Sequence, residues 1–279
     1  MYARAQTWWM IFRLCVAERL AYRGDFVLGT LMRFLPIITQ IFLWTAVFAA
    51  VGSRPIAGFT RDNVVAYYLL TMVVRAFSSM PGLATSIARQ IRDGEIKKFL
   101  IQPIDLVSFM LIARLGHKMV YYGVAIGPFA LVFYVCRDYF PGWPDPAILA
   151  AFIASLLMSF LLGFFLEATF GMIGFWFLEV SSLLFVYMLF NFFFSGHMFP
   201  LDFITGQHFE KLPEPLATMA YYQPLQYLAY FPAALFLGKI PADQVLPRLL
   251  VQAAWVVFFI VACRMTLAAG YRRYSGYGG

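Results

Sequence analysis

Charged residues are scarce in this chain of 279 residues, where Asp, Glu, Lys and Arg together make up 13% of the sequence. Soluble domains carry about 25%. Hydrophobic residues instead make up 62%, aromatic residues make up 19%, and the mean hydropathy is +0.75. The shortage of charge excludes an ordinary soluble globular protein and predicts a polytopic membrane protein.

Cysteine and histidine are also scarce, with three of each. Three cysteines do not build a disulfide framework, and the histidines have no metal-ligand spacing. The sequence contains no HExxH, CxxC or GxSxG motif, and no GxxxxGK(S/T) phosphate loop. We therefore predict no catalytic residue, no metal site and no cofactor bound by this chain.

Long apolar runs are what the sequence has in abundance. A helix needs about 20 apolar residues to cross a hydrocarbon layer of about 30 Å. The run from Ser182 to Phe194 has none of the polar-apolar alternation of a barrel strand. The prediction is one all-α transmembrane domain over residues 1–279. Its six transmembrane helices are expected at residues 28–52, 63–84, 110–135, 147–168, 178–199 and 246–268.

Lysine and arginine are unevenly divided between the two sides of this arrangement. With the N-terminus inside, 12 basic residues lie on the cytoplasmic side and 6 on the opposite side. Cytoplasmic loops carry the excess of Lys and Arg in membrane proteins. Both termini are therefore predicted to be cytoplasmic. The net charge of +7 then reflects topology, and no nucleic-acid partner is predicted.

The segment before the first span, residues 1–27, combines Trp8, Trp9 and Phe12 with several arginines. Its apolar residues recur mostly three or four positions apart, which indicates a helix lying in the membrane interface. The alternative is ordinary flanking sequence that follows the positive-inside rule.

The segment SIARQIRDGEIKKFLIQPIDLVSF, residues 86–109, places four basic and three acidic residues between two apolar spans. Ile87 and Ile91 lie four apart, so a helix there has one apolar edge. Gly94 allows a bend and Pro103 stops a second helix. The pattern predicts a short helix, a bend and another short helix that together form a docking surface for a partner protein. The alternative is a solvated loop whose charges only hold the topology.

The connection from residue 200 to residue 240 is also unusual. Residues 215–238 are apolar enough to enter the bilayer, but Pro215, Pro224 and Pro232 interrupt any continuous helix. Broken backbone at membrane depth has to be sheltered by protein. We predict short re-entrant helices here, with a seventh span as the alternative.

Several ionisable residues lie in or near the predicted spans: Arg75, Arg114, His117, Lys118, Glu167 and Glu179. Each costs about 2.5–3.5 kcal/mol at the centre of a membrane helix, which makes it a functional candidate. One interpretation is a proton relay or a site for a charged substrate. The other is structural ion pairing near the inner interface.

Three stretches resemble the integral-membrane permease subunits of bacterial type-2 ABC exporters, which carry drugs, lipids and polysaccharides. The first is IRDGEIKKFLIQPI, residues 91–104. The second is FSGHMFPLDFI, residues 194–204, in which Gly196, Phe199 and Pro200 match the family pattern. The third is YYQPLQYLAYFPAALFLG, residues 221–238, in which Pro224 matches and Gln223 stands where Asn is more usual. Their order and spacing extend the resemblance over nearly the whole chain.

The resemblance implies a role for each unusual segment. Residues 1–27 would be an interfacial elbow helix, residues 86–105 the coupling helix region, and residues 200–240 the re-entrant helices. The permease would lie in the bacterial cytoplasmic membrane among lipids and work as a dimer with an identical or related permease. A separate cytosolic ATPase dimer would dock on the coupling helices and bind ATP and Mg. The residues that this implies for ATPase coupling are Ile87, Arg89, Ile91, Arg92, Asp93, Gly94, Glu95 and Lys97.

The resemblance also suggests a cargo pathway along the dimer interface, lined by the second and fifth spans. Asn191 and the neighbouring phenylalanines are pathway candidates on that basis, and an aromatic lining would suit amphipathic, lipid-like or drug-like cargo. Two competing functions stay open from the residues. One is a membrane-embedded enzyme that modifies lipids or glycans. The other is an ion-coupled secondary transporter, for which inverted repeats are expected but not evident.

Overall fold

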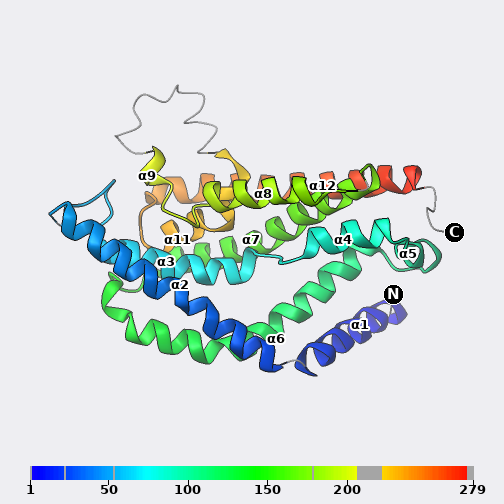
Figure 1. Cartoon of the computed structure of the whole chain (residues 1–279), viewed down its shortest axis with the longest axis horizontal. Coiled ribbons are helices and arrows are strands. Elements are labelled where there is room, and N and C mark those ends of the chain that lie inside the picture. The colour runs from blue at the N-terminus through cyan, green and yellow to red at the C-terminus, as the bar shows by residue number, and fades with distance from the viewer. Residues whose placement is uncertain (1, 22, 53, 178, 206–221, 275–279) are drawn as a thin grey trace. The chain divides into compact units, whose positions relative to one another are not determined.

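The computed structural model describes residues 2–21, 23–52, 54–177, 179–205 and 222–274, which form helices and short connections (Figure 1). The β structure within these ranges is an isolated bridge between Ile56 and Phe59. The all-α prediction is confirmed for this part of the chain. The chain packs as two units, one of residues 1–43 with 96–138 and one of residues 44–95 with 139–279.

The first unit contains three helices and the beginning of a fourth. Helix α1 packs on α6 at Gly116, where an added Cβ would lie 3.4 Å from Cys15 Cβ. The segment predicted as an interfacial helix is therefore helical, and its position at a membrane surface stays a prediction. The elements are α1 (Tyr2–Ala21), the first part of α2 (Arg23–Ala50), α5 (Lys97–Ile101) and α6 (Leu106–Val135).

The second unit is built around α7 (Pro146–Met172), which the 3-10 helix η2 (Ile173–Phe175) continues. Helices that precede it and a helix that follows it in the sequence pack along it, as Figure 1 shows. These are α3 (Arg61–Ser78), α4 (Leu83–Arg92) and α12 (Ala242–Arg273). Helix α8 (Ser181–Phe194) is held less tightly, since its buried side chains are Leu184 and Tyr187.

Glycines give α7 and η2 a smooth face toward α3 and α4. A Cβ added at Gly163 would lie 2.0 Å from the carbonyl oxygen of Ser78. One added at Gly171 would lie 2.9 Å from Ala84 Cα, and one at Gly174 would lie 3.1 Å from Ala88 Cα. Helices in membranes approach this closely through small residues. The glycine face thus sets where α3 and α4 lie on α7.

Four stretches of the described chain are long and apolar enough to cross a membrane: Arg61–Arg92, Leu106–Val135, Pro146–Phe175 and Ala242–Arg273. Two shorter apolar helices, Leu35–Ala50 and Ser181–Phe194, fall where the other two spans are predicted. Fourteen residues of α8 rise about 21 Å, less than the ~30 Å hydrocarbon layer. A multi-pass membrane fold is supported, whereas the count of six spans stays a prediction.

The predicted re-entrant region, residues 200–240, is described in part, because residues 206–221 lie outside the described ranges. The described part contains three short helices: α9 (Asp202–Thr205), η4 (Pro224–Leu228) and α11 (Tyr230–Phe236). Residues 226–235 are buried against other elements of the second unit, which include α3 and α7. These short helices do not form a seventh span within the described residues, and re-entry into the bilayer stays a prediction.

Candidate functional site

The charged segment predicted to dock a partner begins where α3 stops. Pro81 and Gly82 separate α3 from α4, and Gly82 has a φ of 71°, which favours glycine. Helix α4 ends at Arg92, Gly94 turns the chain with a φ of 74°, and α5 follows at Lys97. The predicted helix, bend and second helix are present. The first helix begins at residue 83 rather than 86, because the break after α3 comes earlier than hydropathy indicates.

Ile87 and Ile91 face inward rather than toward solvent. They are 1% and 6% exposed, and Ile87 Cβ lies 2.9 Å from a Cβ built on Gly171 of α7. The apolar edge predicted for this segment therefore holds α4 on its own chain. This arrangement leaves neither isoleucine side chain available as an apolar peg for an ATPase, so their place in the predicted contact set needs correction.

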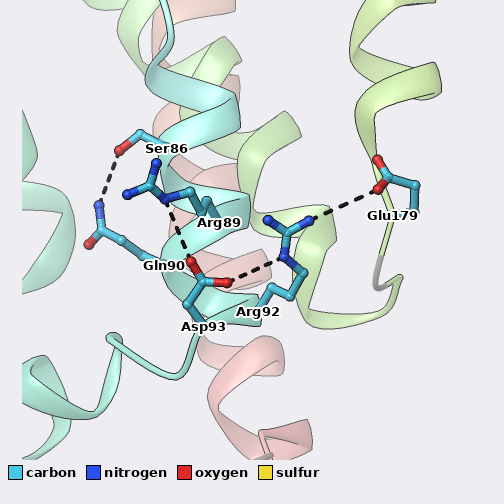
Figure 2. A network of polar contacts seen from close by, with 6 residues as sticks. All are labelled: Ser86, Arg89, Gln90, Arg92, Asp93 and Glu179. Atoms are coloured by element: carbon cyan, nitrogen blue, oxygen red, sulfur yellow. Dashed lines mark hydrogen bonds and ion pairs between the residues drawn. The ribbon is translucent and has the colours of Figure 1, made fainter.

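The opposite face of α4 is polar and solvent-exposed. Arg89 Nε lies 3.6 Å from Asp93 Oδ2, and Arg92 Nε lies 3.4 Å from Asp93 Oδ1 (Figure 2). Gln90 Nε2 donates to Ser86 Oγ at 3.2 Å. Asp93 thus holds both arginines near the end of α4. Glu95 and Lys97, which follow the bend, are also exposed.

An open polar hollow of 420 Å³ lies on this face. One arginine and one glutamate line it together with hydroxyl and amide groups, so it offers both donors and acceptors. Its side chains are suited to polar contacts with a protein surface. The lining residues are Gly82, Thr85, Ser86, Arg89, Gln90 and Glu95.

Glu179 lies just before α8, which begins at Ser181. Its side chain is 66% exposed, and its Oε2 lies 4.0 Å from Arg92 NH1. Oε1 accepts the backbone N–H of Ser181 at 2.8 Å, at the first turn of α8. Hydrogen bonds from Ser181, side chain first and backbone second, lower the pKa of Glu179. The carboxylate therefore bonds the first turn of α8 and faces α4.

The deeper polar candidates lie on α3, α7 and α8. Phe170 of α7 stacks on Tyr187 of α8 with ring centroids 4.6 Å apart. Glu167 lies about one turn before Phe170 on α7, and Arg75 belongs to α3. One α-helical turn beyond Tyr187, Asn191 has a buried Oδ1 atom with no hydrogen-bond donor among the described residues. Glu167 and Asn191 thus each lie about one turn from the ring contact between α7 and α8, whereas Arg75 is on α3, and the functional role of all three stays a prediction.

The residues of the second family-like motif lie in a network that sequence reasoning missed. The hydroxyl of Tyr67 donates to the carbonyl oxygen of Gly196, and that of Tyr68 donates to the carbonyl oxygen of Met198. The backbone N–H of Tyr230 donates to Ser195 O at 2.9 Å. These bonds tie the loop after α8 to α3 and α11. The sequence feature that could have indicated this network is the pair of tyrosines at 67 and 68, whose hydroxyls need hydrogen-bond partners within an apolar run.

The other motif residues occupy neighbouring positions. Pro200 is buried and Phe199 is partly buried. Pro224 begins η4, where a missing N–H costs nothing. The Gln223 side chain spans the connection, because its Nε2 donates to Phe194 O at 2.6 Å while its Oε1 accepts from Leu225 N at 2.8 Å. An amide is needed for both bonds, and Asn, the usual family residue, also carries one.

Asp202 is a partly buried carboxylate beside this network. Tyr230 OH donates to its Oδ1 at 2.9 Å, while Oδ2 has no hydrogen-bond donor within the described residues. Burial raises the pKa of Asp202, despite the opposing effects of the Tyr230 hydrogen bond and of Arg248 and Lys239 nearby.

Because folding raises this pKa, the folded state binds the Asp202 proton more tightly than the unfolded state does. Its contribution to stability is fully present below the ordinary Asp pKa of about 3.9 and is lost as pH rises through the raised folded value. We expect the midpoint of thermal unfolding of wild type, relative to Asp202→Asn, to fall as pH rises through this window. Melting curves of both proteins in one detergent test this, and a constant difference would contradict the assignment.

Groups of His, Cys, Asp and Glu suited to a metal ion do not occur among the described residues. Comparison with known families gives one match. The family model described as ABC-2 family transporter protein matches residues 34–278. No curated protein is similar enough to the chain to count as a relative.

Proposed function

Since the chain belongs to the ABC-2 transporter family and is a multi-pass membrane permease, we propose that it is the permease subunit of an ATP-driven exporter in a bacterial cytoplasmic membrane. A separate cytosolic ATPase dimer supplies ATP hydrolysis, with ATP and Mg bound there. The family match carries this proposal, and the absence of a phosphate loop from the sequence supports a separate ATPase.

The exposed face of α4 and of the bend that follows it is the proposed docking surface for that ATPase. Arg89, Arg92, Asp93 and Glu95 are exposed there, and the hollow beside Arg89 offers polar groups of both kinds. Lys97, exposed at the start of α5 in the other unit, is a proposed contact residue from its place in the chain. Ile87 and Ile91 contribute indirectly, because they fix α4 on α7. Charged complementary surfaces set partner choice and speed association.

The proposed transport pathway requires a second permease, identical or related. Helix α8 presents large apolar side chains outward along its length, among them Phe185, Met188 and Phe190. An apolar, aromatic surface of this kind supports amphipathic, lipid-like or drug-like cargo. Both termini are proposed to be cytoplasmic, which places the α4 to α5 segment on the same side as the ATPase.

Charge reversal on the docking surface tests the proposal. We expect wild-type permease, affinity-purified from native membranes in a mild detergent, to retain an ATPase that carries a Walker motif. The double variant Arg89→Glu/Lys97→Glu should retain about tenfold less or lower, because reversed charges repel the partner surface. The amount of ATPase per permease, measured by quantitative mass spectrometry, is the readout.

The matched control is Arg61→Glu, at the opposite end of the α3 to α4 stretch. Arg61 is half-exposed and pairs with Asp62 at 2.9 Å, so this variant also breaks a surface ion pair. It should leave ATPase retention unchanged. Equal ATPase retention in all three proteins would rule out this face as the docking surface. Failure of wild type to retain any ATPase would contradict the proposed function itself.

A further inference from the structure

Helix α4 meets the start of α8 through an apolar layer. Ala84 and Ala88 of α4 form one buried cluster with Val180 and Leu184, and Phe170 and Ile173 of the α7 to η2 stretch pack beside it. Apolar contact of this kind is non-directional. It keeps the two elements together but does not by itself fix how α8 is turned or shifted against α4.

A polar layer lies over the same joint, as Figure 2 shows. Arg92 lies between two carboxylates, with Asp93 Oδ1 3.4 Å from its Nε and Glu179 Oε2 4.0 Å from its NH1. Glu179 is in turn bonded to the backbone N–H of Ser181 at 2.8 Å. One side chain of α4 is thereby linked through one carboxylate to the first turn of α8.

The ion pair has little part in holding the fold together. The Arg92 and Glu179 side chains are 49% and 66% exposed, and exposed pairs add little to stability. An ion pair does have direction, however, since it favours one relative position of the two groups that carry the charges. Helix α8 is the element that such a pair can move, because Leu184 and Tyr187 are its buried side chains.

We propose that Arg92 and Glu179 are positioning residues that carry movement of α4 over to α8. The inference rests on the proposed function, because docking and closure of the ATPase supply the movement. The apolar cluster keeps α4 and α8 in contact, and the ion pair sets the direction in which α8 moves. When the ATPase displaces α4, α8 then moves with α4 instead of letting α4 slide past it, and the outward-facing apolar surface of α8 is repositioned.

A cysteine reporter on α8 measures this transmission. In the purified permease–ATPase complex, Cys15, Cys136 and Cys263 are replaced by alanine and Phe185→Cys is added, since Phe185 is 66% exposed. The modification rate of this thiol is compared between the nucleotide-free state and the state trapped with ATP and vanadate. The ratio of the two rates is the quantity followed in every variant.

We expect Glu179→Gln and Arg92→Gln each to bring the rate ratio roughly two- to fivefold closer to one, the range that an exposed ion pair supports. The conservative variant Arg92→Lys, which keeps a positive charge between Asp93 and Glu179 and leaves the Glu179 bond to Ser181 intact, should keep the ratio near its wild-type value. Asp138→Asn is the matched control, because it breaks an exposed pair with the adjacent Arg137 at 3.6 Å that joins no second helix. That variant should leave the ratio at its wild-type value.

The outcomes separate the two proposals. An unchanged ratio in Glu179→Gln, with the ATPase still bound, overturns the transmission role and leaves the proposed function standing. An Arg92→Lys variant that binds ATPase but loses the ratio as fully as Arg92→Gln also overturns it, because the positive charge is then not the link. A wild-type permease that retains no ATPase overturns the proposed function and this inference with it.

Discussion

Gly163→Ala is expected to lower the free energy of unfolding by about 3 kcal/mol, the upper end of the cost of overpacking. The added methyl carbon would lie 2.0 Å from the carbonyl oxygen of Ser78, a backbone atom of α3 that cannot rotate away. Helices α3 and α7 have to separate to admit it. The midpoint of thermal unfolding of the purified protein in a mild detergent measures the loss.

The matched control for this substitution is Gly123→Ala in α6, where a Cβ would meet nothing within 4 Å and no proline follows directly. Alanine favours a helix over glycine by up to about 1 kcal/mol, so this control should melt at or above the wild-type temperature. If Gly163→Ala and the control melt at the same temperature, α3 and α7 do not approach each other closely at Gly163.

The same separation has a functional consequence, because α4 follows α3 after four residues. The proposed docking face lies on α4, whose inner face rests on Gly171 and Gly174. We therefore expect Gly163→Ala to reduce ATPase retention as well. The substitution reaches the docking surface through packing alone, since Gly163 is buried.

Hydropathy and turn residues were sufficient to predict the helical segments, but not their partners. Gly94 and the neighbouring charges predicted the bend between α4 and α5, and both short helices formed. Ile87 and Ile91 were read as a binding edge because an amphipathic helix has the same pattern whichever surface covers it. Gly171 and Gly174, which lie against this helix, are 80 or more residues away in the sequence.

Pairing between distant residues was equally hidden. In the sequence, Arg92 belonged to the docking segment and Glu179 to the ionisable residues in or near the spans. Ion pairing near the inner interface was one interpretation of Glu179, but the pattern did not indicate Arg92 as its partner. Their link depends on Val180 and Leu184 packing on α4. The sequence likewise indicated that Gly196 belongs to a family-like motif, without indicating which side chains require a glycine at that position.

The expected effect of Gly196→Ala follows from those side chains. Gly196 has a φ of 81°, which costs an L-residue about 1–2 kcal/mol. Its added Cβ would also lie 2.5 Å from Tyr230 Cβ and 2.8 Å from Tyr67 OH, which adds about 1–3 kcal/mol of overpacking. We expect the two costs together to destabilise the protein by about 2–5 kcal/mol, measured by thermal unfolding.

Gly238→Ala separates the two costs. Gly238 has a φ of 65° and nothing within 4 Å of an added Cβ, so this variant pays for backbone conformation alone. It should fall between wild type and Gly196→Ala in melting temperature. Equal melting of the two variants would mean that Tyr67 and Tyr230 do not close on Gly196. A larger loss in Gly196→Ala would instead identify this contact as what holds the loop after α8 against α3 and α11, and hence why the motif requires glycine there.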